Sequence, residues 1–140
     1  MPDRLIDTNI LVYAYDTSEG AKHDFAKNIV KQIWQNGGGV VCVQNLMEFF
    51  VVITKKVTSP ISVSDAKIII DDMTRSDSWR VIDRDINTFL KAINIVSQYS
   101  VHLWDATIIA CMKESGVTHI VTENTSDFEG IPDIHVIFPF

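Results

Sequence analysis

Several features that define whole classes of protein are scarce in this sequence. The 140 residues include two cysteines, four prolines and six glycines, and 12 Lys and Arg stand against 18 Asp and Glu. No apolar run approaches the roughly 20 residues that a bilayer-spanning helix needs, and the start, Met1 to Asp7, lacks the apolar segment of a signal peptide. A net charge of −6 disfavours binding of nucleic acid through a general positive field. We therefore expect an unsecreted, cytoplasmic protein.

The two cysteines carry no recognisable chemistry. Cys42 lies in a valine run and Cys111 lies in an Ile-Ile-Ala-Cys-Met run, with neither a CxxC motif nor a Cys/His spacing typical of metal sites. Free cysteines are among the most buried residue types. We expect reduced packing thiols, which fits a reducing compartment.

Short runs rich in Val and Ile alternate with longer segments of helical periodicity. This alternation predicts one domain over residues 1–140, with an α/β fold in which helices cover both faces of a central parallel sheet. The expected strands are 4–6, 40–43, 79–83, 118–122 and 134–138, and the expected helices are 9–15, 21–34, 46–56, 64–75 (with Ser62 or Ser64 as its cap), 86–99 and 104–114.

Acidic residues recur where ligands bind in such folds, just after the strands. Asp7 and Asp83 each follow an expected strand, and residues 123–127 follow another. Glu48 and Asp105 lie among apolar residues near the starts of two expected helices. If the topology is that of a parallel sheet, these carboxylates meet at one edge.

A cluster of carboxylates repels itself unless cations neutralise it. No Lys or Arg lies within four residues of Glu48 or Asp105, although Arg4 or Arg80 is open as a tertiary partner. Oxygen ligands suit Mg²⁺ or Mn²⁺, and the negative net charge does not exclude a nuclease that works through such ions. The alternative is structural, because acids at helix starts are favoured by the helix dipole and Asp83 is a candidate helix cap.

Four segments of the chain, in order and spacing, resemble the PIN-domain ribonucleases, and most closely the VapC-type toxins of toxin–antitoxin pairs. The resemblance covers essentially the whole chain. It implies a Mg²⁺- or Mn²⁺-dependent endoribonuclease, a homodimer, and a small antitoxin protein that blocks the site. The segments are Leu5-Ile-Asp-Thr-Asn9, Gln44-Asn-Leu-Met-Glu-Phe49, Leu103-Trp-Asp-Ala-Thr-Ile-Ile-Ala110 and Val121-Thr-Glu-Asn-Thr-Ser-Asp-Phe128.

The resemblance also assigns roles to residues. Many relatives carry Asp where this chain has Asn124, or an acid three residues further on, where this chain has Asp127. The fourth acid is therefore assigned to Asp127, and Asn124 is interpreted as a neutral helper. If Asp127 points away, a catalytically weak PIN scaffold that binds RNA or protein becomes the alternative function. The catalytic and metal-binding residues implied are Asp7, Glu48, Asp105 and Asp127, with supporting residues Thr8, Asn9, Thr122 and Asn124.

Two further expectations concern the surface. No cluster of aromatic residues in the sequence indicates a platform for stacking nucleobases. Phe49-Phe50 and residues 68–70 supply more apolar surface than one helix face needs, which predicts a groove for a second copy or for the antitoxin.

Overall fold

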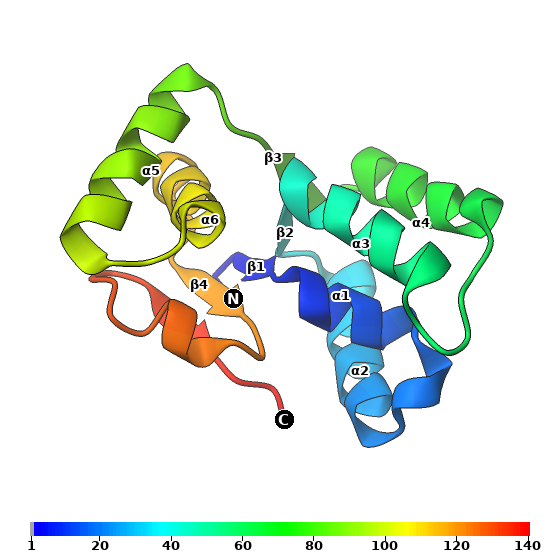
Figure 1. Ribbon diagram of the computed structural model, residues 1–140. Helices are drawn as coiled ribbons and strands as arrows, with labels where there is room; N and C mark the ends of the chain where they lie inside the picture. Colours follow the sequence, from blue (N-terminus) through cyan, green and yellow to red (C-terminus); the bar gives the residue numbers. More distant parts are fainter. Residues whose placement is uncertain (1) are drawn as a thin grey trace.

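The computed structural model describes residues 2–140 and contains a five-stranded sheet (Figure 1). All four neighbouring strand pairs are parallel, which confirms the expected α/β class. The strands, in the spatial order β3-β2-β1-β4-β5, are β1 (Arg4–Ile6), β2 (Gly39–Cys42), β3 (Trp79–Ile82), β4 (His119–Val121) and β5 (His135–Ile137).

Helices lie on both faces of the sheet. Helices α1, α2, α3 and α4 lie on one side and α5 and α6 on the other (Figure 1). Their bounds are α1 (Thr8–Tyr15), α2 (Ala21–Asn36), α3 (Val43–Lys55), α4 (Val63–Arg75), α5 (Ile86–Tyr99) and α6 (Leu103–Glu114), with short 3₁₀ turns η1 (Thr17–Glu19) and η2 (Thr125–Asp127).

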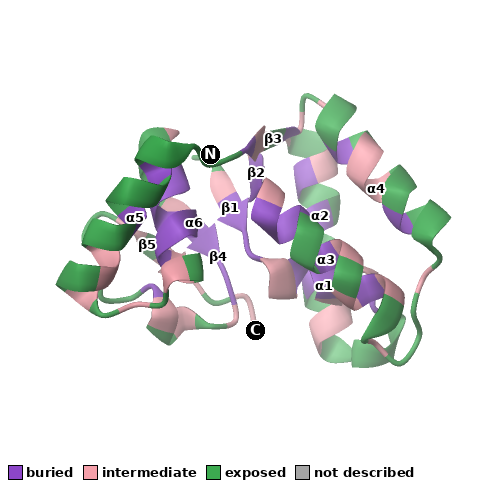
Figure 2. Ribbon diagram, turned by 45° about the horizontal axis from the view of Figure 1, so that its top comes forward, coloured by how far each residue is buried: buried purple, intermediate pink, exposed green. Residues whose placement is uncertain are grey.

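The alternation of side chains along the strands supplies both faces of the core. On β1, Leu5 packs with the α6 cluster, whereas Ile6 packs with the cluster of α1 to α4. Val40 and Val41 of β2 divide in the same way, because successive side chains of a strand point to opposite faces. Burial is deepest in the inner strands and in α6, while α4 and α5 are largely exposed (Figure 2). The strands consist of continuous Val/Ile runs because their side chains are buried on both faces of the sheet.

Strand order determines where a ligand can enter. The chain passes from β1 through β2 to β3 on one side, and then returns to β4 and β5 on the other side of β1. The direction of winding therefore reverses between β1 and β4. In open parallel sheets the crevice at such a reversal, outside the carboxyl ends of the strands, is the usual binding site.

One sequence-based helix start and one predicted cap are wrong for local reasons. Helix α3 begins at Val43, three residues before the expected start, because Cys42 and Asn45 form a reciprocal capping box across its first turn. The cap of α5 is Asp85, not Asp83: an Asp85 carboxylate oxygen accepts from the backbone N–H of Thr88 at 3.0 Å. Asp83 is exposed and accepts only from the N–H of Arg84, at 2.7 Å.

Both cysteines are free and buried, as expected. The fold also brings the two thiols together, which their separation in sequence gave no reason to expect. The pKa of the Cys42 thiol is raised, first by its hydrogen bond with the Cys111 thiol and second by burial. None of the helices in residues 2–140 combines the length and the apolar character needed to cross a bilayer.

Candidate active site

A pocket of about 350 Å³ opens at the carboxyl ends of β1 and β4, at the predicted edge of the sheet. Its walls come from the starts of α1, α3 and α6 and from the segment after β4. Three of the four predicted acids line it, together with neutral polar and apolar side chains. The lining residues are Asp7, Thr8, Asn9, Val12, Tyr13, Gln44, Glu48, Val52, Trp104, Asp105, Ile108 and Asn124.

Asp7 lies at the centre of this site. It follows β1 directly and caps α1, and its Oδ1 accepts from the backbone N–H of Thr8 at 2.8 Å. Its Oδ2 accepts from the Thr122 hydroxyl at 2.8 Å, so the chain after β4 holds the acid that follows β1. Asn9 and Asn45 donate to the two carboxylate oxygens at 3.4 Å. These donors fix the orientation of the carboxylate.

The environment of Asp7 opposes its negative charge. The residue is 7% exposed, and burial, the largest cause, raises the pKa of its carboxyl group. The hydrogen bonds from Thr122 and Thr8 act in the opposite direction, and the charges of Glu48 and Asp127 raise the pKa further. A cation at this point would remove the penalty of ionisation.

Glu48 approaches from the second turn of α3. Its Oε2 accepts from the Thr8 hydroxyl at 3.0 Å, and its Oε1 accepts from the Gln44 side-chain amide at 3.1 Å. Thr8 therefore links Glu48 to Asp7, since its backbone and its hydroxyl each donate to one of the two acids.

Asp105 is in the first turn of α6 and Asp127 is in η2. Burial, and then the charges of Asp127 and Asp7, raise the pKa of Asp105 to about 6. Asp127 does not line the pocket, whereas Asn124 does. The fourth acid is thus close enough to act electrostatically on Asp7 and Asp105, but it is not one of the residues that line the pocket.

Among residues 2–140, no basic side chain forms an ion pair with these acids, although the charge of His102 partly opposes the rise in the pKa of Asp105. The ion pairs among the described residues join Lys22 to Glu123, Arg80 to Asp3 and Lys91 to Glu114. Arg80, one of the two tertiary partners left open by the sequence, is therefore committed elsewhere. Arg4, the other, has a buried Nε without a hydrogen-bond partner.

The donor set fits a hard divalent cation in kind and in charge. The buried Oε1 of Gln44, beside Glu48, also lacks a hydrogen-bond donor in the described part of the chain, which leaves a further oxygen acceptor free. Within residues 2–140, however, no three Asp, Glu, His or Cys side chains already converge on a common metal position.

Three residues of the site were missed or misread in the sequence. Asn45 is fully buried and donates at 3.1 Å to the Thr8 hydroxyl as well as to Asp7. Gln44 is 7% exposed and holds Glu48. The signal for both was two adjacent amides within an apolar segment directly after a strand. Trp104 lines the pocket and is exposed; its position next to Asp105 was visible, but its exposure was not.

Glu123 lies at the same edge but in a different environment. Its carboxylate accepts from the Tyr13 hydroxyl at 2.6 Å and pairs with Lys22. Although burial alone would raise it, these two partners lower the pKa of Glu123 below its ordinary value. Glu123 does not line the pocket, but its partner Tyr13 and its chain neighbour Asn124 do, so Glu123 is a compensated acid at the rim of the pocket.

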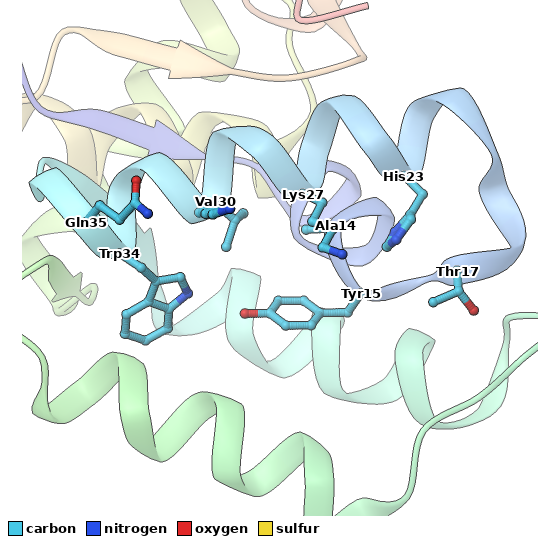
Figure 3. A pocket seen from close by; sticks show the side chains of 9 residues that line it. Ala14, Tyr15, Thr17, His23, Lys27, Val30, Trp34 and Gln35 are labelled. Atoms are coloured by element: carbon cyan, nitrogen blue, oxygen red, sulfur yellow. The ribbon is translucent and has the colours of Figure 1, made fainter.

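A larger cavity, of about 540 Å³, lies away from the acids, between α1 and α2. Figure 3 shows Tyr15 and Trp34 directed into it, with His23 and Lys27 at its edge. No carboxylate lines this cavity, so the chemistry expected from the sequence belongs to the smaller pocket.

Comparisons with known proteins agree with this geometry. The family model of the PIN domain matches residues 4–133. No match is found among curated protein sequences. Among solved structures, a chain of a toxin–antitoxin complex from Klebsiella pneumoniae is similar over 99% of this chain and 98% of its own, with a TM-score of 0.72 and 22% identity.

Two further solved structures have the same fold. VapC20 of Mycobacterium tuberculosis, described as a toxin that cleaves the sarcin–ricin loop, has a TM-score of 0.64 and 15% identity, with 89% of this chain and 93% of that chain covered. A chain of VapBC from Salmonella typhimurium, solved bound to DNA, has a TM-score of 0.66 and 17% identity, with 98% of each chain covered.

The fold and the pocket define an α/β protein with acids gathered at the carboxyl edge of a parallel sheet, and the family match makes the assignment specific. The chain belongs to the PIN-domain family. Its structural neighbours include toxin components of toxin–antitoxin complexes, as the sequence resemblance predicted.

Proposed function

We propose that the protein is a metal-dependent endoribonuclease that hydrolyses RNA phosphodiester bonds, and that it is the toxin of a VapBC-type pair. One observation carries the proposal: Asp7, Glu48 and Asp105 line one pocket without a basic partner among the described residues. The catalytic acids are these three and Asp127. Membership of the PIN family and the toxin structures among its neighbours support the same conclusion.

Mg²⁺ or Mn²⁺ would be held by Asp7, Glu48 and Asp105, with Asp127 in support. When bound, such an ion supplies Lewis-acid activation of water and of the phosphate. The chain's own contribution is orientation: Thr122, Asn9 and Asn45 fix the Asp7 carboxylate. Thr8 and Gln44 fix Glu48, so that this acid can accept a proton from the attacking water. Asn124 at the rim offers a neutral donor to a phosphate oxygen.

The proposal is tested by incubating a mixed RNA pool with purified wild type and Asp7→Asn, each with Mn²⁺, with Mg²⁺ and with excess chelator. We expect cleavage only by wild type, and only with a metal ion. Cleavage by Asp7→Asn at the wild-type rate, or cleavage in chelator, would contradict the proposal.

A second candidate function is a PIN scaffold that binds RNA or protein but cleaves poorly. It is favoured by the position of Asp127 outside the pocket and by the lack of three converged ligands in residues 2–140. This candidate predicts that wild type binds RNA but leaves it intact under every metal condition.

The partners follow from the same proposal. A groove of about 490 Å³ on α3 and α4 is lined almost entirely by apolar side chains, among them Met47, Phe50, Val51 and Ile70. Phe49, expected at such a surface, is instead fully buried against Tyr15. We propose that residues 1–140 form one PIN domain that acts in the cytoplasm as a homodimer under the control of a small antitoxin. Met47→Glu should lower the mass measured by light scattering if the groove joins two copies.

A further inference from the structure

One exposed aromatic side chain lies in the first turn of α6, a helix whose central residues are buried. Every residue of α6 from Ala106 to Met112 is buried, yet Trp104 in the first turn is 62% exposed. A Trp side chain can bury some 150–250 Å², so leaving it in water forgoes a large stabilisation. This position therefore suggests a ligand.

The other two tryptophans show what a structural role looks like in this protein. Trp34 and Trp79 form an edge-to-face pair with ring centroids 5.8 Å apart, and both belong to the core of the α1 to α4 side. Trp104 takes part in none of the aromatic pairs or core clusters formed by residues 2–140. Its ring is left available for contact from outside.

The surroundings of Trp104 restrict the kind of ligand. It lines the same pocket as Asp7, Glu48 and Asp105, and it precedes Asp105 directly in the chain. An apolar protein segment placed on Trp104 would also cover these uncompensated acids, and their desolvation would weaken its binding. A nucleotide meets both features, because its phosphate approaches the acids together with a divalent cation and its base offers a flat face to the indole.

We infer that Trp104 stacks on one unpaired base of the RNA, beside the phosphate that is cleaved; this inference rests on the proposed function. A base inside a duplex is covered on both faces by its neighbours, whereas a base in a single strand or a loop is free to stack on an aromatic side chain. Trp104 is thus a positioning residue that selects unpaired RNA. The aromatic platform that the sequence did not indicate is formed by the fold.

Three substitutions separate aromatic stacking from simple bulk. Trp104→Ala and Trp104→Leu should each lower kcat/KM on a single-stranded RNA by about 10- to 100-fold, the range that base–aromatic stacking supports. Trp104→Phe should stay within about threefold of wild type. Phe25→Ala is the control, because Phe25 is also exposed, at 53%, but does not line the pocket. Equal activity of the Leu variant and wild type would overturn the inference.

Removal of single bases identifies the stacked nucleotide. Once the cleaved bond has been mapped, abasic residues are placed one at a time on either side of it. At one abasic position, the kcat/KM of wild type should fall by about the same factor as Trp104→Ala lowers it on intact RNA. The kcat/KM of the Trp104→Ala variant should fall little further on that abasic RNA, because the stacking contact is already lost. Independent, additive losses at every position would contradict stacking.

Binding without cleavage keeps the two proposals distinguishable. The Asp7→Asn variant, expected to be inactive, is titrated with fluorescent single-stranded RNA, alone and combined with Trp104→Ala. Weaker binding by the double variant, by about tenfold or more, supports stacking. Active wild type with unchanged binding by the double variant overturns the stacking inference alone. Failure of wild type to bind or cleave RNA overturns the proposed function itself, and the inference with it. If Trp104→Ala lowers only the oligomer mass or antitoxin binding and leaves RNA binding unchanged, Trp104 contacts protein and the stacking inference is overturned.

Discussion

Two kinds of acid stand at the same edge of the sheet, and they differ in what surrounds them. Glu123 lies two residues after the end of β4 and is paired with Lys22 and Tyr13, and these partners lower its pKa. Asp7 directly follows β1 and has only neutral donors, and burial above all raises its pKa. Asp105 resembles Asp7, with a pKa of about 6 caused mainly by burial.

The contrast teaches that a strand-end position does not make an acid functional. The fold places Lys22 beside Glu123, whereas the donors to Asp7 and Glu48 among the described residues are hydroxyl and amide groups. Unpaired, partly buried carboxylates are costly. This energetic cost is explained if a divalent cation binds these acids and compensates their negative charge.

The largest expected effect on RNA cleavage comes from replacing an acid of the pocket by its amide, compared with the same replacement at Glu123. Glu48→Gln and Asp105→Asn should each reduce RNA cleavage by roughly 100-fold or more, since each removes a charge that a cation needs. Glu123→Gln, of matched shape, should retain activity within about threefold. The measurement is kcat/KM on one RNA at fixed Mn²⁺. Equal losses in all three variants would remove the distinction between pocket and rim.

A smaller effect is expected from the hydrogen bond that orients Asp7. Thr122→Val keeps the shape of a fully buried side chain but removes the donor 2.8 Å from Asp7 Oδ2. Loss of such an outer-shell donor typically costs 10- to 100-fold in metal affinity or activity.

Thr107→Val is the matched control for Thr122→Val. Its buried hydroxyl donates only to the Leu103 carbonyl, at 2.8 Å, within α6. It should leave kcat/KM and the apparent Mn²⁺ affinity unchanged. If Thr122→Val also leaves both unchanged, the donor to Asp7 has no functional role.

The smallest effect is on stability without metal. The folded-state pKa of Asp105 is raised from 3.8 to about 6, so its ionisation destabilises the fold: the penalty is absent below about pH 4 and complete above about pH 7. Discounted for partial exposure, the penalty is about 1 kcal/mol. Asp105→Asn should therefore raise Tm by roughly 3 °C at pH 8 and not at pH 4. A lower Tm at pH 8, measured by calorimetry in chelator, would mean that Asp105 stabilises the fold.

Much of the fold could be predicted because its signals are local. The Val/Ile runs, the helical periodicity and the turn glycines place the five strands and six helices, and 86–99 matches α5 at both ends. Errors arose at helix caps: the start of α3 was placed too late, and the wrong residue was chosen as the cap of α5. Asp83 and Asp85 are both reasonable caps in the sequence, and only the bond to Thr88 selects Asp85.

The candidate site was harder to predict because its supports are tertiary. The motif residues Asp7, Glu48 and Asp105 do line one pocket, but the hydroxyl of Thr122 reaches Asp7 across 115 positions of sequence. The exposure of Trp104 depends on how α6 docks on the sheet, and the position of Asp127 outside the pocket depends on the path of η2. No local sequence pattern encodes these tertiary contacts.

The most direct test is a calorimetric titration of Mn²⁺ into metal-free wild type, Glu123→Gln and Asp7→Asn, with Tm measured at saturation. We expect saturable binding to the first two proteins and a gain of about 2.7 kcal/mol in unfolding free energy at 100 times Kd. Asp7→Asn should show neither. Binding by Asp7→Asn as tight as by wild type, or no binding by wild type, would contradict the claim that the unpaired acids await a cation.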